Sequence, residues 1–584
     1  MQIFALTFLY CLWLFPAIPI SFAPEKIDPA LEVILQAGDR ADCIVLLREQ
    51  ADLRDAYLIK DKRAKGRYVF AQLYQQHQRK QASLRAFLQA EGISYTPLYL
   101  VNALRIKADR DILRKVANRP EVASIRSNPK MEVPRLRPER PLLEARSQEP
   151  EWNLIDIGAD QVWAMGYRGE GVVVGGQDTG FDWQHPTLIR QYRGNQGGTV
   201  DHNYNWYDAI HEYSPLHAEA TNPCGLSITE PCDDNVHGTH TMGTMVGEDT
   251  QGNQIGVAPK AQWIGVRNME RGYGNPFSYL EAFQWFLAPT DVNGDKPNPD
   301  LAPHVINNSW YCPDLEGCNE SNIGLLEMAV ENLRAAGIVV VNSAGNFGSD
   351  CGTITELPAV FPASFAVGAT DINQQIATFS SRGPVYRTDG SILIKPDVAA
   401  PGVNVRSASL NGGFSAFSGT SMAGPHVVGT VALMISANPD LAGQVDSVEA
   451  ILRRTARPRF SNQDCGPLVG DQSPNAVFGY GIIDARAAVE AALQFVVSGT
   501  TSNSSAMDLR LYPNPTRGML RLTRSDLQVV MDLRLVNMQG QVLGQKRWAQ
   551  GSTTLDWNLD LPPGLYLLHY RWRDKSYTKK LVVQ

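Results

Sequence analysis

The chain has 584 residues, of which 43% are hydrophobic and 19% are charged, and its formal net charge is −7. This length predicts several domains, and the composition is typical of globular domains and argues against a disordered chain. The weak negative charge argues against nucleic-acid binding, which needs a basic face. The one locally basic stretch, residues 60–80, is mixed with Gln and Tyr and is expected to be a solvated helix face.

Residues 1–23 form an apolar run that ends in S-F-A at Ala23. This pattern predicts a secretory signal peptide that is cleaved after Ala23. An uncleaved membrane anchor is the alternative, but Pro16 and Pro19 interrupt the run. No later segment of the sequence is apolar enough to span a bilayer.

Residues 24–130 alternate between strand-like and helical patterns, which predicts a small α/β domain. Residues 131–150 are rich in Pro, Arg and Glu without periodicity, and we expect an exposed linker that proteases cut during maturation. Strands are predicted at 41–47, 98–106 and 122–125, and helices at 68–91 and 111–116.

Residues 151–495 carry short apolar runs that alternate with helical stretches, which predicts a parallel sheet with crossover helices. Residues 496–508 are a Ser/Thr-rich linker. Residues 509–584 have strand patterns separated by Pro, Gly and Asn turns, which predicts a small β-sandwich. In the parallel-sheet region, strands are expected at 171–176, 263–266, 305–308, 338–342 and 366–368.

The chain has eight cysteines. Cys11 lies in the predicted signal peptide and Cys43 in the 24–130 domain, so six remain. An even number in an exported chain favours disulfides, and zinc is disfavoured because no C-x-x-C pattern occurs. Connectivity does not follow from sequence, but the spacing suggests the pairs Cys224–Cys232, Cys312–Cys318 and Cys351–Cys465.

Three segments carry residues that are typical of catalysis. Asp178, in D-T-G, ends a buried strand, where functional residues of open α/β sheets gather. A plain turn is the alternative, and the aspartic-protease interpretation fails because no second D-T-G occurs. His237, in H-G-T-H, can act as a general base near neutral pH. A zinc pair with His240 is disfavoured because neither H-E-x-x-H nor H-x-x-E-H occurs.

Ser421, in S-G-T-S-M-A-G-P-H, begins an amphipathic helix. The free N–H groups of a helix N-terminus would face a developing oxyanion, although a serine here could also simply cap the helix. The three motifs together, in the order Asp, His, Ser, resemble the subtilisin family of serine proteases over residues 151–495. The α/β-hydrolase and chymotrypsin types have other orders.

This resemblance implies a subtilisin-like α/β fold and an endopeptidase that cuts proteins and peptides through an acyl-enzyme on Ser421. It also implies that Asn346, after the strand expected at 338–342, donates its amide to the oxyanion. The substrate peptide is expected to lie along 307–311, with Tyr311 replacing the glycine usual in the family. The residues expected to bind substrate are Ser309, Trp310, Tyr311, Ser343, Ala344 and Gly345.

No cofactor is required by this chemistry, but structural calcium is common in the family. Asp291, Asn293 and Asp295 alternate like the oxygen ligands of a calcium loop. A solvated loop explains the same residues equally well, because the rest of an EF-hand is absent.

The two flanking domains also have resemblances. Residues 24–130 are similar to subtilisin propeptides, which implies that the chain carries its own inhibitor. L-Y-P-N-P near Tyr512, P-G-L-Y near Tyr566 and the basic C-terminus resemble a type IX secretion sorting domain. That implies contact with this secretion machinery and a place outside a Gram-negative cell, either secreted or at the surface. A carbohydrate- or protein-binding sandwich is the alternative.

Two other functions stay open at this point. A catalytically idle surface or adhesion protein could use the same fold, although such proteins generally lose a triad residue and this chain retains all three. A processing protease of narrow specificity is the second possibility, because Tyr311 and the long spacings between the motifs could restrict the substrates.

Overall fold

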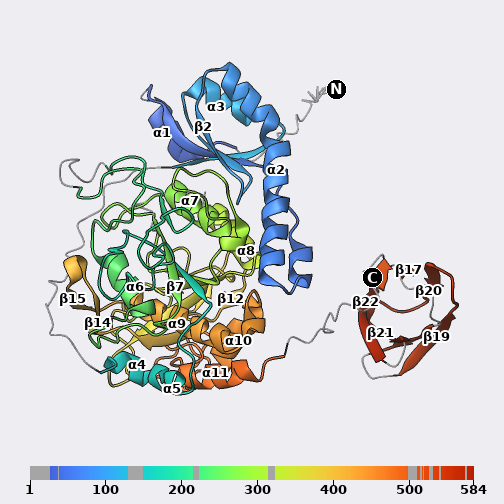
Figure 1. The fold of residues 1–584 in the computed structure, drawn as a ribbon. Helices are drawn as coiled ribbons and strands as arrows, with labels where there is room; N and C mark the ends of the chain where they lie inside the picture. Colours follow the sequence, from blue (N-terminus) through green and yellow to red (C-terminus); the bar gives the residue numbers. More distant parts are fainter. Residues whose placement is uncertain are drawn as a thin grey trace, which may run out of the picture. The chain divides into compact units, whose positions relative to one another are not determined.

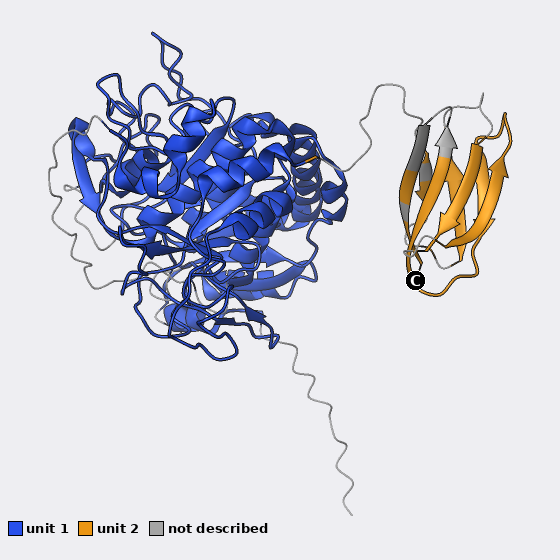
Figure 2. Cartoon of the chain, turned by 90° about the horizontal axis from the view of Figure 1, so that it is seen from below, with its two compact units in different colours: residues 1–495 blue, residues 496–584 orange. Residues whose placement is uncertain are grey.

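In a computed structural model of the chain, the described residues are 26–36, 38–128, 149–214, 222–312, 318, 323–496, 509–512, 516, 518–524, 531–537, 541–572 and 575–583. The predicted signal peptide and most of the two predicted linkers lie outside these residues. The chain forms two compact units, residues 1–495 and 496–584 (Figure 2).

The larger unit begins with an antiparallel sheet in the strand order β2-β3-β1-β4 (Figure 1). The prediction of one strand over 98–106 is wrong. β2 ends at Leu98 and β3 begins at Ala103, and the turn between them is buried, so its apolar residues imitate strand alternation. The elements are α1 (Pro29–Gln36), β1 (Ala41–Leu47), η1 (Arg54–Leu58), α2 (Lys62–Ala90), β2 (Tyr95–Leu98), β3 (Ala103–Ala108), α3 (Arg110–Ala117) and β4 (Val122–Ser127).

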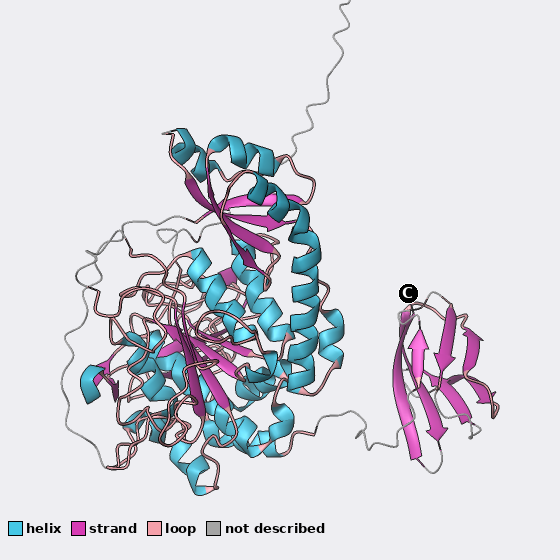
Figure 3. Ribbon diagram, turned by 45° about the horizontal axis from the view of Figure 1, so that its top comes forward, coloured by secondary structure: helices cyan, strands magenta, loops and turns pink. Residues whose placement is uncertain are grey.

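Helix α2 is longer than predicted, because Asp61 caps it at Lys62 by accepting a hydrogen bond from Ala64 N. It runs beside α8 (Ile323–Ala335) in Figures 1 and 3. The expectation of a solvated basic face is wrong for its first turns. Lys65 is only 5% exposed and donates a hydrogen bond to the carbonyl of Gly443, 2.5 Å away.

A sheet of seven strands forms the centre of the larger unit, and all its neighbouring strands are parallel, as predicted. Their order is β13-β10-β9-β8-β5-β7-β6, so β8 is the central strand and β5 lies next to it. The strands are β5 (Val173–Asp178), β6 (Trp206–Asp208), β7 (Gln262–Arg267), β8 (Val305–Asn308), β9 (Val339–Ser343), β10 (Phe365–Thr370) and β13 (Val398–Pro401).

Helices cover both faces of this sheet (Figure 3), and each face has its own apolar core. One core contains side chains of α6 (His237–Val246), α9 (Thr420–Ala437) and α11 (Ala485–Leu493). The other contains side chains of α7 (Pro276–Leu287) and α8. This second core also includes residues of the N-terminal domain, such as Leu98 of β2 and Val101 of the turn after it, so the two parts pack as one body.

Shorter elements complete the larger unit. They are α4 (Trp152–Asp156), α5 (Ala159–Ala164), η3 (Pro299–Leu301), β11 (Val385–Tyr386), β12 (Ile392–Leu393), β14 (Val405–Ala408), η5 (Leu410–Gly412), β15 (Phe414–Phe417), η6 (Pro439–Leu441) and α10 (Val445–Thr455).

The smaller unit contains two antiparallel sheets, in the orders β16-β17-β20 and β19-β18-β21-β22. Leu520 from one sheet and Leu568 from the other lie in one core, which gives the predicted β-sandwich. The strands are β16 (Arg510–Tyr512), β17 (Met519–Thr523), β18 (Met531–Val536), β19 (Val542–Trp548), β20 (Thr554–Asn558), β21 (Gly564–Trp572) and β22 (Lys575–Val583).

The three expected disulfides are all formed, and Cys43 is a buried free thiol. None of the helices within the described ranges combines the length and the apolar character that a membrane span requires.

Candidate active site

Strand β5 and helix α6 bring Asp178 and His237 together. Asp178 is the last residue of β5 and is 1% exposed, while His237 is the first residue of α6. The Nδ1 atom of His237 lies 2.8 Å from Oδ1 of Asp178. This contact fixes the ring and leaves its Nε2 for another partner.

The electrostatics of His237 suit a base that becomes charged during a reaction. Burial by itself lowers the pKa of the imidazole, but the charge of Asp178, the hydrogen bond to it and the charge of Asp233 outweigh burial. The net result is a raised pKa, because these groups stabilise the protonated ring.

Ser421 lies in the first turn of α9, where the backbone N–H groups have no acceptor within the helix. Its Oγ donates a hydrogen bond to the carbonyl of Ser309 at 3.2 Å, and Ser309 Oγ donates to the carbonyl of Ser421 at 2.8 Å. These two bonds join α9 to the segment after β8. Rotation about one side-chain bond would redirect the Ser421 hydroxyl, and catalytic hydrogen bonds commonly tighten only when substrate is bound.

Asn346 follows β9 and has a fixed amide orientation. Its Oδ1 accepts hydrogen bonds from the backbone N and the Oγ1 of Thr420, both at 2.9 Å. Both contacts use the oxygen, so the Nδ2 donor faces away from Thr420. Thr420 precedes Ser421, and the N-terminus of α9 therefore orients the donor expected at an oxyanion.

The predicted substrate-binding residues divide into two groups by side-chain position. Trp310 is 3% exposed and stacks on Tyr279 with ring centroids 3.9 Å apart, so its side chain belongs to the core. Tyr311 instead contacts Phe347 edge to face, with centroids 5.0 Å apart. The rings therefore join the segment after β8 to the segment after β9.

The remaining predicted wall residues lie at the end of β9. Ser343 is its last residue, and Ser343 and Ala344 are buried. Gly345 has a φ of +105°, a conformation that favours glycine and turns the chain toward Asn346.

His240 lies near His237 in sequence but has a different environment. It is fully buried, its Nε2 lies 3.0 Å from the carbonyl oxygens of Val405 and Ser415, and its ring stacks on Phe417. Burial lowers its pKa to about 3. These contacts explain the second histidine of the motif without a metal.

The Asp291 loop is held by its own hydrogen bonds. The Asp291 carboxylate accepts from the backbone N of Asn293 at 3.2 Å and of Asp295 at 3.0 Å, and it pairs with Lys296. Within the described part of the chain, no group of three or more His, Cys, Asp and Glu side chains is arranged to hold a metal ion. Calcium binding here stays a prediction.

Sequence reasoning missed three residues of this region: Thr420, Phe347 and Asp233. Thr420 and Phe347 adjoin Ser421 and Asn346, so their positions beside predicted residues were the available signal. Asp233 is the first of two adjacent aspartates in D-D-N-V-H. The sequence does not indicate which of these two carboxylates is turned toward the site.

Comparison with known proteins finds two family matches. Residues 169–481 match the subtilase family, and residues 510–584 match a secretion system C-terminal sorting domain. Bacillopeptidase F of Bacillus subtilis is 38% identical over 412 residues, which cover 67% of this chain and 26% of that protein.

Two further relatives are shorter. Serine protease AprX of Bacillus subtilis is 34% identical over 286 residues, covering 45% of this chain and 59% of that protein. Subtilisin DY of Bacillus licheniformis is 32% identical over 288 residues, covering 49% of this chain and 84% of that protein. The chain thus spans about a quarter of bacillopeptidase F and about three fifths of AprX.

Proposed function

The chain belongs to the subtilase family, and from this we propose that it is a serine endopeptidase that cuts proteins and peptides and is self-processed from a proenzyme. Its sorting domain assigns it to the secreted or surface proteins of a Gram-negative bacterium. We further propose the type IX secretion machinery as the partner of that domain. The single observation that carries the proposed activity is the 2.8 Å contact of His237 with Asp178, in the same unit as Ser421 and Asn346.

The proposed reaction first forms an acyl-enzyme and then releases it, and each of these groups has the same role in both stages. His237 Nε2 takes the hydroxyl proton of Ser421 as Oγ attacks the scissile carbonyl carbon, and Asp178 stabilises the imidazolium that forms. Asn346 Nδ2 and the Ser421 backbone N–H stabilise the oxyanion. The imidazolium then gives its proton to the leaving amine, and water releases the acyl group from Ser421 by the same steps.

The contacts of the turn between β2 and β3 support a propeptide that stays bound to the catalytic domain. Gln284 on α7 accepts hydrogen bonds from the backbone N of Tyr99 at 2.6 Å and of Leu100 at 3.1 Å. Asn332 on α8 donates to the carbonyl of Leu100 at 2.6 Å. The turn at 99–102 is thus held by both helices, as expected for a propeptide that stays on the enzyme until it is removed.

A second contact lies at the start of α2. Lys65 donates to Gly443, Gln444 donates to the carbonyl of Lys60 at 2.7 Å, and Arg67 pairs with Asp300 at 2.5 Å. This second contact supports tight association of the N-terminal domain with the catalytic domain, because it adds to the contact that the turn at 99–102 makes with α7 and α8.

One observation supports a protease of narrow specificity as the second candidate function. The Tyr311 and Phe347 rings meet between the segment expected to bind the peptide and the segment that carries Asn346. Bulky side chains here would restrict the substrate side chain next to the cut bond. A catalytically idle surface protein is the less favoured function, since nothing would then require the fixed amide of Asn346.

The test compares wild-type, Ser421→Ala and Ser418→Ala precursors without the signal peptide. Ser418 is a matched control, because its Oγ accepts a hydrogen bond from Asn404 N and has no proposed catalytic role. Intact mass would follow cutting at 131–150, and casein hydrolysis would follow activity. We expect wild type and Ser418→Ala to trim themselves and digest casein, and Ser421→Ala to do neither. Inert wild type that stays full length would favour the idle protein. Trimming without casein hydrolysis would favour the narrow protease.

A further inference from the structure

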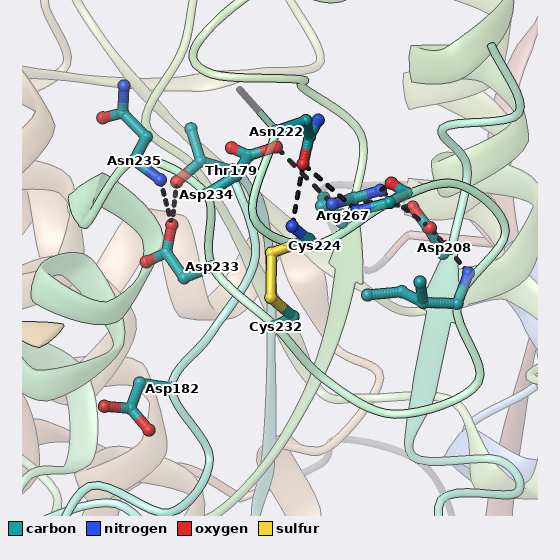
Figure 4. Close-up of a disulfide and its surroundings, with 12 residues drawn as sticks. Thr179, Asp182, Asp208, Asn222, Cys224, Cys232, Asp233, Asp234, Asn235 and Arg267 are labelled. Atoms are coloured by element: carbon teal, nitrogen blue, oxygen red, sulfur yellow. Dashed lines mark hydrogen bonds and ion pairs between the residues drawn. A yellow bond between two sulfur atoms is a disulfide. The ribbon is translucent and has the colours of Figure 1, made fainter. Parts of the chain in front are cut away.

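Asp233 is a buried carboxylate that directly follows Cys232 and precedes α6 (Figure 4). The Cys224–Cys232 disulfide fixes the loop from which it extends. The proposed mechanism gives it no role, although it lies between the two elements that supply Asp178 and His237.

The hydrogen bonds of Asp233 connect both of these elements. On the side of β5, its Oδ1 accepts from Thr179 Oγ1 at 2.8 Å, and the same Thr179 Oγ1 accepts from Gly238 N at 3.1 Å. On the side of α6, its Oδ2 accepts from the backbone N of Thr239 at 2.9 Å and from Thr239 Oγ1 at 2.6 Å. Thr179 follows Asp178, and Gly238 follows His237.

Asp233 also holds a strained residue next to His237. Val236 has a φ of +87°, which is a genuine outlier for a β-branched residue. Asp233 Oδ1 accepts hydrogen bonds from the backbone N of Val236 and of Asn235, both at 3.0 Å. Such conformations persist only where the surroundings over-determine them, and they cluster at functional sites.

We propose that Asp233 is a positioning residue of the protease, which sets the placement of His237 against Asp178 by joining the end of β5 to the start of α6. The inference rests on the proposed function, because it assumes that His237 is the base. Asp233 itself touches neither substrate nor reacting atoms.

Asp233→Asn is the sharpest perturbation. Both carboxylate oxygens accept from N–H groups, so either orientation of the amide turns its NH₂ toward a donor and loses contacts on one side. Since displacements of about 1 Å cost up to 10²-fold, we expect kcat to fall roughly 10–100-fold. KM should stay within about threefold, because no contact to the peptide is removed.

Asp234→Asn is the matched control. Asp234 is also a buried carboxylate, but it accepts from Arg271 N at 2.8 Å and pairs with Arg267 at 3.5 Å. Its removal should lower the melting temperature and leave kcat within about twofold of wild type. Each variant is assayed after trypsin has cut the linker at 131–150 and digested the propeptide-like domain, the trypsin has been removed and the mass has been checked, so a failure of self-processing or a bound propeptide-like domain is not read as a loss of kcat.

Val236→Gly separates positioning from general stability. Glycine adopts positive φ without the cost that valine incurs, so it should hold the turn with less help from Asp233. We expect Asp233→Asn/Val236→Gly to recover at least about fivefold in kcat over Asp233→Asn. If Asp233→Asn does not fold, Thr179→Val carries the test. It loses the hydroxyl that joins Asp233 to Gly238 but retains the shape, and its kcat should fall about tenfold.

The inference is overturned if wild type is active and Asp233→Asn, or Thr179→Val in its place, has a kcat within about twofold of it. It is also overturned if the whole loss is in KM, or if Val236→Gly recovers nothing. Failure of the proposed function looks different, because wild type and Ser421→Ala would then be equally inactive.

Discussion

Gln284 offers the most direct measure of how tightly the propeptide-like domain is held. Its Oε1 accepts the backbone N–H groups of Tyr99 and Leu100, residues that are 9% and 0% exposed. Gln284→Ala leaves both donors without this acceptor. A buried donor that loses its partner costs about 1–3 kcal/mol. The two together should weaken binding by roughly 2–6 kcal/mol, which is a change in Kd of at least about 25-fold.

Gln284→Glu is the matched control, because a carboxylate oxygen can accept the same two N–H groups. The assay uses the Ser421→Ala background, so that nothing is degraded, with the linker at 131–150 cut by limited trypsin treatment. The fraction of the propeptide-like domain that stays bound is then followed by gel filtration across a dilution series. We expect Gln284→Ala to release it at much higher protein concentration than Gln284→Glu or the parent. Equal Kd values for all three would refute the reasoning that this acceptor holds the turn.

The other predictions concern the active-site residues and one disulfide of the catalytic domain. Asn346→Ala should lower kcat by about 10²–10³-fold in steady-state kinetics, with little change in KM, because its amide is expected to donate only to the oxyanion. Burial lowers the pKa of His237, but Asp178 raises it above its usual value, so activity should be lost as pH falls through the raised pKa. Asp178→Asn should move that acid limb to lower pH and lower kcat roughly 10⁴-fold, and a pH profile of kcat/KM would show a fixed limb if this is wrong. Replacing Cys351 and Cys465 by Ala frees a loop with a sequence separation of 114 and should lower the unfolding free energy by about 2–5 kcal/mol in urea titration.

The sequence predicted the parallel sheet because its strands are short apolar runs with helices between them, and it predicted the disulfides because two of the three loops are short. The positions of Asp178 and His237 were predictable as the end of a strand and the start of a helix. What escaped prediction depends on long-range contacts. Trp310 lies in the segment that is expected to bind substrate, but the stacking of its side chain on Tyr279, which is 31 residues earlier in the chain, was not predicted. Nothing local to either residue indicates this stacking.

The dependence on long-range contacts also explains why the burial of the basic residue at the start of α2 was not predicted, and the same contacts bear on maturation. Lysine on a helix is usually solvated, and only the carbonyl of Gly443, far along the chain, accounts for the burial of Lys65. The propeptide-like domain therefore holds the catalytic domain in two places, through the turn at 99–102 and through the start of α2. Because the first contact keeps the second at high effective concentration, cutting the linker at 131–150 should not by itself free the enzyme. We expect full activity only after the propeptide-like domain is itself degraded, so casein hydrolysis should lag behind linker cleavage.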